Sequence, residues 1–146
     1  MSNKLLLYNT SIVIEDKSFQ LLLNFIQSIR PTTFFILVDS NTKKHCLPIL
    51  IHNVPILQKS YVLELQPGES MKSIKSVEKI CSFLLQHNVD RNSLLINLGG
   101  GCICDVGGFV ASIIKRGIKF INIPTTLMAQ VDAAIGGKVG VNFDNN

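Results

Sequence analysis

Two charged residues stand out in residues 124–142, PTTLMAQVDAAIGGKVGVN, a segment that is mostly small and apolar. Asp132 and Lys138 are its only charges. An acid and a base in an apolar setting cost free energy unless each has a partner. A polar ligand that carries an anionic group would supply such partners. The alternative is an ion pair between Asp132 and Lys138 themselves.

A run of three glycines at 99–101 marks a second candidate site, directly after the apolar run SLLINL. Glycine lets the backbone approach a ligand closely, and the free N–H groups of a helix that follows favour phosphate. The spacing is weaker than the dinucleotide-binding pattern GxGxxG, because Cys104 holds the third glycine position. The alternative is a tight strand-to-helix turn in which Asp105 is the N-cap.

Acidic residues follow two other apolar runs, and each has two interpretations. Asp39 follows FFILV, where it could hold an adenine ribose hydroxyl or be the N-cap of the next segment. Glu69 lies in a turn with Gly68 and Lys72, and by itself it is typical of a first helical turn facing the helix dipole. The three histidines form no ligand-like cluster, so no metal site is expected.

Strand-like and helical patterns alternate between these sites. Strands are expected at residues 4–8, 11–14, 34–38, 61–65, 93–98 and 119–123, and helices at 18–29, 74–84, 106–114 and 125–134. The clearest helix has an apolar face made of Ile74, Val77, Ile80, Cys81 and Leu84. The alternation predicts a single Rossmann-like α/β domain over residues 1–146, with a mostly parallel sheet and flanking helices. Ligands bind at the carboxyl ends of such strands, so the segments that follow three of them, at residues 39–41, 99–105 and 124–126, should lie at one edge of the sheet.

Composition favours a small anionic ligand over nucleic acid or a membrane. The net charge is +4, but the basic residues are scattered and the few aromatic residues are not interleaved with them. No apolar run reaches the roughly 18 residues of a membrane span, and no signal peptide opens the chain. The cysteines are expected to be reduced thiols of a cytoplasmic protein. Charged residues make up only 16%, so either a partner surface covers part of the chain or its composition is biased.

Taken together, the motifs between residues 99 and 142 resemble those of the 3-dehydroquinate synthase family. In order they are GGGxxxD at 99–105, GFVA at 108–111, RG at 116–117, PTTL at 124–127, QVD at 130–132 and GGKxGVN at 136–142, with weaker matches DSN at 39–41 and PGExxK at 67–72. The resemblance covers nearly the whole chain, but only the N-terminal, NAD-binding part of the family's protein. This chain departs from the family pattern at Cys104 (usually glycine), Ile114 (often tyrosine), and Ala133 and Ala134 (often serine).

The resemblance implies an NAD-dependent lyase of the shikimate pathway. It would convert 3-deoxy-D-arabino-heptulosonate 7-phosphate, a phosphorylated keto-sugar acid, to 3-dehydroquinate plus phosphate, for aromatic amino acid biosynthesis. It also implies a homodimer and a divalent metal, zinc or cobalt, whose ligands lie in the family's helical C-terminal domain, beyond Asn146. This chain alone is therefore expected to supply the NAD-binding part and to be inactive, and a separate C-terminal chain could complete it.

The resemblance also implies roles for individual residues. Those implied in catalysis are Asp132, Lys138 and Arg116, the last reaching the substrate phosphate in the neighbouring subunit of a dimer. Those implied in cofactor binding are Asp39, Asn41, Gly68, Glu69, Lys72, Gly99, Gly100, Gly101, Cys102, Asp105, Thr125, Thr126, Asp132 and Lys138. Among these, residues 39 and 41 would lie near the adenosine, 69 and 72 on its ribose, and 99–105 along the pyrophosphate and nicotinamide ribose. No metal ligand is implied within the chain.

Three alternatives stay open at this point. Another sugar-phosphate cyclase would share the glycine turn and the lysine. A metal-dependent alcohol or glycerol-1-phosphate dehydrogenase tends to follow Pro-Thr-Thr with a Gly-Thr-Gly-Ser type of turn, whereas LMAQ follows here and argues against that class. The third is a non-catalytic NAD-binding or dimerising fragment.

Overall fold

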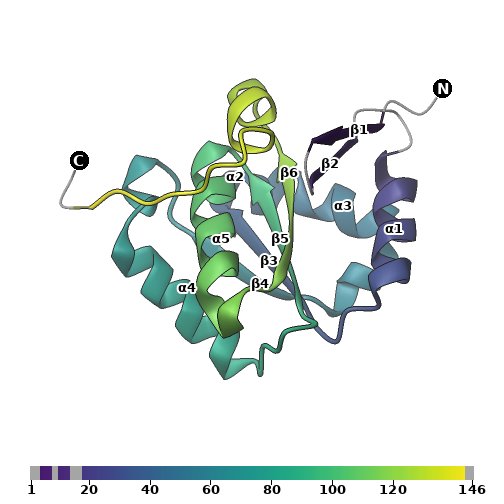
Figure 1. Cartoon of the computed structure of the whole chain (residues 1–146), viewed down its shortest axis with the longest axis horizontal. Coiled ribbons are helices and arrows are strands. Elements are labelled where there is room, and N and C mark those ends of the chain that lie inside the picture. The colour runs from purple at the N-terminus through teal and green to yellow at the C-terminus, as the bar shows by residue number, and fades with distance from the viewer. Residues whose placement is uncertain (1–3, 8–9, 14–17, 144–146) are drawn as a thin grey trace.

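A four-stranded parallel sheet forms the centre of the structure, a computed structural model that describes residues 4–7, 10–13 and 18–143. Its strands are β3 (Phe34–Asp39), β4 (Tyr61–Leu65), β5 (Leu94–Gly99) and β6 (Lys119–Pro124), in the order β4-β3-β5-β6. A separate antiparallel pair, β1 (Lys4–Leu7) and β2 (Thr10–Val13), lies near helix α1 (Figure 1). The predicted strands are confirmed, with Tyr8 and Ile14 of the first two lying outside the described residues.

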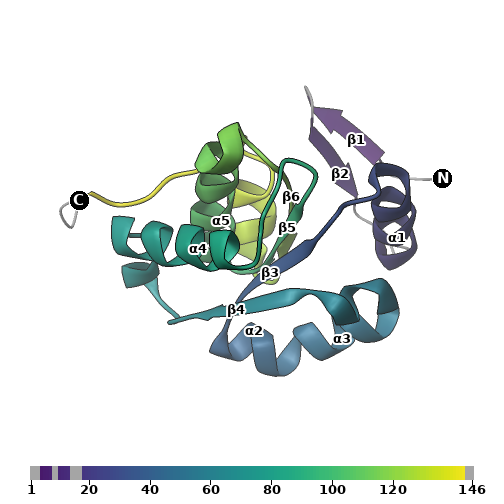
Figure 2. The same cartoon turned by 90° about the horizontal axis from the view of Figure 1, so that it is seen from below.

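Helices cover both faces of this sheet, as is usual for parallel strands. They are α1 (Ser18–Ile29), α2 (Ser40–His45), α3 (Leu47–Asn53), α4 (Ile74–Gln86) and α5 (Gly101–Ile113), with 3₁₀ turns at Pro55–Lys59, Glu69–Met71 and Ile114–Arg116 and a π-helical turn at Ala129–Ala133. Figures 1 and 2 show α4 and α5 on one face of the sheet and α1 and α3 on the other. The predicted Rossmann-like α/β architecture is confirmed. None of the described helices is long and apolar enough to cross a membrane.

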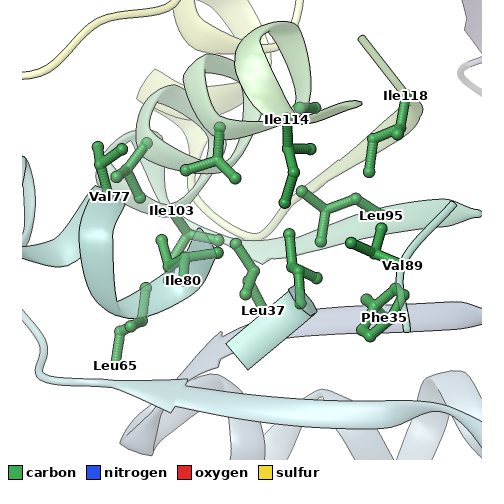
Figure 3. Close-up of a cluster of buried hydrophobic side chains, with 14 of the residues drawn as sticks. Phe35, Leu37, Leu65, Val77, Ile80, Val89, Leu95, Ile103, Ile114 and Ile118 are labelled. Carbon is green, nitrogen blue, oxygen red and sulfur yellow. The ribbon is translucent and has the colours of Figure 1, made fainter. Parts of the chain in front are cut away.

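Two apolar cores lie between the sheet and its helices. Phe35 and Leu37 of β3 belong to the core under α4 and α5, and Ile36 and Val38 belong to the core under α1 and α3. Figure 3 shows the first of these cores, in which side chains of α4 and α5 meet those of β3 and β5. Because successive residues of a strand point to opposite faces, burial on both faces produces the uninterrupted apolar runs of the sequence.

Helix α5 begins at Gly101, earlier than the predicted residue 106. Its N-cap is Gly100, in the extended conformation usual for that position (φ −74°, ψ −172°), so the alternative that makes Asp105 the N-cap is wrong. The apolar face of the helix starts at Ile103 and Cys104, which are both buried, and their packing places the start of the helix at Gly101. Asp105 consequently lies within the helix.

The predicted apolar face of α4 is correct except at its first residue. Val77, Ile80 and Leu84 are buried in the core, whereas Ile74 is 45% exposed. Ile74 is the first residue of α4, and the sheet does not cover the apolar face at that end of the helix.

Helices α2 and α3 occupy residues 40–53, for which the sequence analysis predicts no helix. The start of α2 is fixed by a capping box: Asp39 Oδ1 accepts a hydrogen bond from Thr42 N–H at 2.8 Å, and Thr42 Oγ1 accepts one from Asp39 N–H at 3.0 Å. The N-cap interpretation of Asp39 is therefore confirmed. This short helix is polar on most of its surface, which leaves little apolar periodicity in the sequence.

Candidate functional site

The carboxyl ends of β3, β5 and β6 meet at one edge of the sheet, as predicted. The chain leaves β3 toward β4 on one side and leaves β5 toward β6 on the other, so the two connections diverge between β3 and β5. Parallel sheets bind ligands at such a switch point. Asp39, Gly99 and Pro124 end these strands, and Thr125 N–H donates to the Gly99 carbonyl at 3.0 Å.

The glycine turn between β5 and α5 places no side chain at the start of α5. A Cβ at Gly99 would come within 2.6 Å of an isoleucine side chain of α5, so packing alone requires this glycine. A Cβ at Gly100 would meet Thr126 Cγ2 at 3.6 Å and one at Gly101 would meet Ala133 Cβ at 3.9 Å, which are ordinary contacts. The N-cap has no side-chain hydrogen bond, so the first N–H groups of α5 keep their capacity to bind an anion.

Lys72 is the centre of a polar network beside this turn. Its Nζ lies 2.9 Å from Asp105 Oδ2 and 3.6 Å from Glu69 Oε1. Glu69 also accepts hydrogen bonds from Cys102 Sγ at 3.1 Å and Asn142 Nδ2 at 3.4 Å. The hydrogen bond to Asp105 is the main cause that raises the pKa of Lys72. The hydrogen bond from Cys102 is the main cause that lowers the pKa of Glu69, so both groups stay charged near neutral pH.

A cleft of about 270 Å³ joins this network to the segment that follows β6. Its lining residues are Lys72, Asp105, Asp132, Ala133, Lys138, Val139 and Gly140. Two lysines and two aspartates therefore border one space, and all four are among the predicted site residues. Ammonium groups hold phosphate, and carboxylates accept hydrogen bonds from hydroxyls, so the cleft suits a phosphorylated, hydroxylated ligand.

Asp132 and Lys138 are more exposed than predicted. Their side chains are 64% and 81% exposed, and Leu127, Met128 and Val131 of the same segment also face solvent. The premise that the two charges lie in an apolar setting is wrong, because the helical turn that carries Asp132 lies on the surface and not in the core. The ion pair between the two residues is present at 3.6 Å, but an exposed pair contributes only about 0–1 kcal/mol. Their position on the cleft is therefore more informative than their pairing.

Other predicted residues lie in the segments that follow the strands at this edge. Asn41 is exposed in the first turn of α2. Gly68 has φ +105°, a conformation that favours glycine, and it leads into the 3₁₀ turn Glu69–Met71. Thr126 Oγ1 accepts a hydrogen bond from Ala129 N–H at 3.2 Å and so begins the helical turn after β6.

Arg116 lies at the opposite end of α5 from the glycine turn. The helix has 13 residues, which corresponds to about 20 Å at 1.5 Å per residue, so Arg116 does not line the cleft of its own chain. Its φ is +65° and that of Lys115 is +51°, two consecutive left-handed conformations outside glycine. The role in a neighbouring subunit that the resemblance implies stays a prediction.

Cys102 is expected to react slowly with alkylating reagents. Burial, with the hydrogen bond to Glu69 as the second cause, raises its pKa to about 11. Because the thiolate is the nucleophile, alkylation at pH 8 should be about a hundredfold slower than that of free cysteine, whose pKa is about 8.5. The measurement is the iodoacetamide rate at Cys102 by mass spectrometry as a function of pH. The rate should still rise at pH 10, whereas steric shielding alone would give a plateau, and Glu69→Gln should speed the reaction.

Four further residues contribute to the site, although neither their types nor the resemblance assigned them a role. Ala133, Val139 and Gly140 line the cleft, and Asn142 contacts Glu69. Gly140 and Asn142 are fixed positions of the motif GGKxGVN, so for these two the signal was present in the sequence, as part of the resemblance. Val139 is the variable position of that motif.

The same fold occurs in solved sugar-phosphate cyclases. A crystal structure of 2-deoxy-scyllo-inosose synthase, complexed with carbaglucose-6-phosphate, NAD+ and Co2+, has a TM-score of 0.86 over 100% of this chain and 41% of that chain, at 20% identity. The 2-epi-5-epi-valiolone synthase from Streptomyces hygroscopicus, with NAD+ and Zn2+ bound, has a TM-score of 0.74 over 95% of this chain and 39% of that chain, at 23% identity. The chain thus has an α/β fold found in the sugar-phosphate cyclases.

Sequence similarity gives the family. The family profile described as 3-dehydroquinate synthase N-terminal matches residues 62–146. The 3-dehydroquinate synthase of Parabacteroides distasonis is 49% identical over 121 residues, which cover 83% of this chain and 34% of that protein. The chain belongs to the 3-dehydroquinate synthase family, and it spans about a third of the length of the relatives that it matches.

Proposed function

We propose that this chain is the NAD-binding part of a 3-dehydroquinate synthase. The whole protein would be a cytoplasmic lyase that converts 3-deoxy-D-arabino-heptulosonate 7-phosphate to 3-dehydroquinate and phosphate. The observation that carries the proposal is the cleft, where Lys72 and Asp105 meet Asp132 and Lys138 beside the glycine turn. Relatives named 3-dehydroquinate synthase, at 39–49% identity, favour this reaction over that of another cyclase.

The glycine turn fits the pyrophosphate of NAD. Gly100 and Gly101 leave the start of α5 free of side chains, so its N–H groups can donate to phosphate oxygens. Lys72 adds positive charge within the same network, and Glu69 and Asp105 provide oxygens that accept hydrogen bonds from ribose hydroxyls. When bound, NAD would supply a hydride acceptor and, after reduction, a hydride donor. Asp39 at the end of β3 and Asn41 in the first turn of α2 would lie toward the adenosine.

The other wall of the cleft would hold the substrate. Lys138 would bind its phosphate or carboxylate, and Asp132 would orient one of its hydroxyls. In a homodimer, Arg116 of a second subunit would reach the phosphate. Among residues 4–7, 10–13 and 18–143, no three His, Cys, Asp or Glu side chains are grouped so that they could hold a metal, so the proposal assigns no zinc or cobalt ligand to them.

Calorimetric titration of the chain with NAD tests the cofactor site. Binding in the micromolar to low millimolar range is expected. Lys72→Met should weaken it by about tenfold or more, because one charge-assisted interaction is worth about 1.5–3 kcal/mol. Lys79→Met is the matched control, since Lys79 is an exposed lysine of α4 and not among the residues that line the cleft. No heat at millimolar NAD, or equal weakening by both variants, would contradict the site. Product analysis of the whole protein with the heptulosonate then tests the reaction.

A further inference from the structure

The segment that carries Lys138 has few points of attachment. Residues 136–142, here called the Lys138 strap, cross over α5 after the helical turn, as the yellow chain in Figure 1 shows. Gly136 N–H donates to the Asp132 carbonyl at 2.7 Å, where the strap begins. Gly137 and Gly140 have open space around them, since a Cβ on either would meet no atom within 4 Å. Neither glycine therefore fixes the strap by packing.

One attachment lies in the middle of the strap. Val139 packs on the backbone of α5 at Gly108, so closely that a Cβ at Gly108 would overlap Val139 Cγ1. Val139 is nevertheless 38% exposed, so this contact holds the strap from one side only.

A second attachment is Val141, which is partly buried and packs against the core under α4 and α5. The third is Asn142, which contacts the chain at both ends of the 3₁₀ turn Glu69–Met71. Its N–H donates to the Lys72 carbonyl at 2.7 Å, and it forms a parallel β-bridge with Ser73. Its side-chain Nδ2 donates to Glu69 Oε1 at 3.4 Å. The same residue thus ties the strap to the backbone of Lys72 and to the carboxylate that neighbours the Lys72 ammonium group.

We propose that Asn142 is a positioning residue that fixes the Lys138 strap against the Lys72 turn and so holds the two walls of the cleft together. One wall of the cleft, with Lys72 and Asp105, is built on the core. The other, with Lys138, lies on a glycine-containing segment that only Val139, Val141 and Asn142 attach to the rest of the described chain. Ordering a loop before a ligand arrives removes part of the entropic cost of binding. The inference rests on the proposed cofactor site for its effect on affinity, but the attachment itself does not depend on NAD.

Limited trypsin digestion tests the attachment. Trypsin cleaves after Lys138 only when the segment around it is locally unfolded, so the rate of this cleavage reports how firmly the strap is held. Asn142→Ala should speed cleavage after Lys138 by about fivefold, the effect of one lost hydrogen bond. Cleavage after Lys59, in the 3₁₀ turn Pro55–Lys59 away from the strap, should not change and reports global unfolding. Asn24→Ala is the matched control, since Asn24 is exposed on α1. Equal cleavage after Lys138 in Asn142→Ala and the wild type would overturn the proposal.

A swap of partners separates positioning from general packing. Asn142→Asp places two carboxylates together, so cleavage after Lys138 should rise at least as much as in Asn142→Ala. Adding Glu69→Gln restores an amide and a carboxylate with their roles exchanged, and cleavage should return to within about twofold of the Glu69→Gln single variant. If the double variant is cleaved as fast as Asn142→Asp, the contact with Glu69 does not hold the strap.

Gly108→Ala tests the attachment that Val139 makes to α5. Its methyl group should displace Val139 and speed cleavage after Lys138, although alanine favours the helix itself.

A titration with NAD measures whether the position of the strap affects binding. NAD affinity should fall by about fivefold in Asn142→Ala. An unchanged affinity alongside faster cleavage would overturn the role in positioning. If the wild type binds no NAD, the proposed function fails, while the cleavage results still decide whether Asn142 holds the strap.

Discussion

Replacing Gly100 with aspartate is expected to lower the NAD affinity of the chain by about a hundredfold without weakening the fold. The new carboxylate would accept the first-turn N–H groups of α5 that the pyrophosphate is proposed to use, and its charge would repel the phosphates. Like charges about 4 Å apart cost about 4 kcal/mol at the effective dielectric of a protein surface, so a hundredfold loss is a moderate expectation. The measurement is calorimetric titration with NAD.

The same substitution should keep or raise stability, because nothing in the fold requires glycine at position 100. Its backbone is extended, and a Cβ would meet Thr126 at 3.6 Å, an ordinary contact. Aspartate is a better N-cap than glycine, and it restricts the unfolded chain more, so the free energy of unfolding should rise by about 0.5–1 kcal/mol.

Gly100→Asn is the matched control, since asparagine has the same shape and caps the helix without a charge. Its loss of NAD affinity should be clearly smaller than that of Gly100→Asp, and its stability should be similar. Equal affinities for Gly100→Asp and the wild type would mean that the pyrophosphate lies elsewhere. A lower melting temperature in both variants would mean that the turn needs glycine for folding, which the backbone geometry argues against.

Most of the fold could be predicted because strands that are buried on both faces of the sheet have uninterrupted apolar runs in the sequence. All six residues of β5 are buried, and the run SLLINL has no polar interruption apart from Asn97. The start of α5 could not be placed in the same way. Glycine is a poor helix former, and the helix nevertheless begins at Gly101 because Ile103 and Cys104 pack in the core, which is a tertiary effect. Helix α2 depends on a capping box in place of an apolar face.

The ordered motifs named four residues that line one cleft in the structure, Lys72, Asp105, Asp132 and Lys138, but they did not indicate the contacts between them. Their roles stay predictions. The exposure of Asp132 and Lys138 was misjudged because an apolar composition does not tell whether a segment is buried. The contact between Asn142 and Glu69 joins residues 73 positions apart, which no local pattern can indicate.

Replacing Gly107 with alanine is expected to lower the free energy of unfolding by about 1–3 kcal/mol, the usual cost of overpacking a core. A Cβ at Gly107 would overlap the side-chain amide of Asn97, and both residues are buried. Asn97 has little room to move away, since its Nδ2 donates to Asn122 Oδ1 at 2.9 Å across the neighbouring strand. Alanine is otherwise better than glycine inside a helix by about 1 kcal/mol, so a net loss of stability must come from the overlap.

Urea denaturation of single and double variants identifies the source of that loss. Asn97→Ala removes the amide that the new methyl group would strike, so the double variant Asn97→Ala/Gly107→Ala should be more stable than the sum of the single effects by about 1–2 kcal/mol. Gly140→Ala is the control for a glycine with open space, and it should change stability by less than about 0.5 kcal/mol. Additive losses in the double variant would show that α5 shifts as a whole on β5. Glycine at position 107 would then be needed because it lets α5 pack close to β5. A shift of the whole helix would also move its first turn, so NAD affinity should fall in Gly107→Ala even in the Asn97→Ala background.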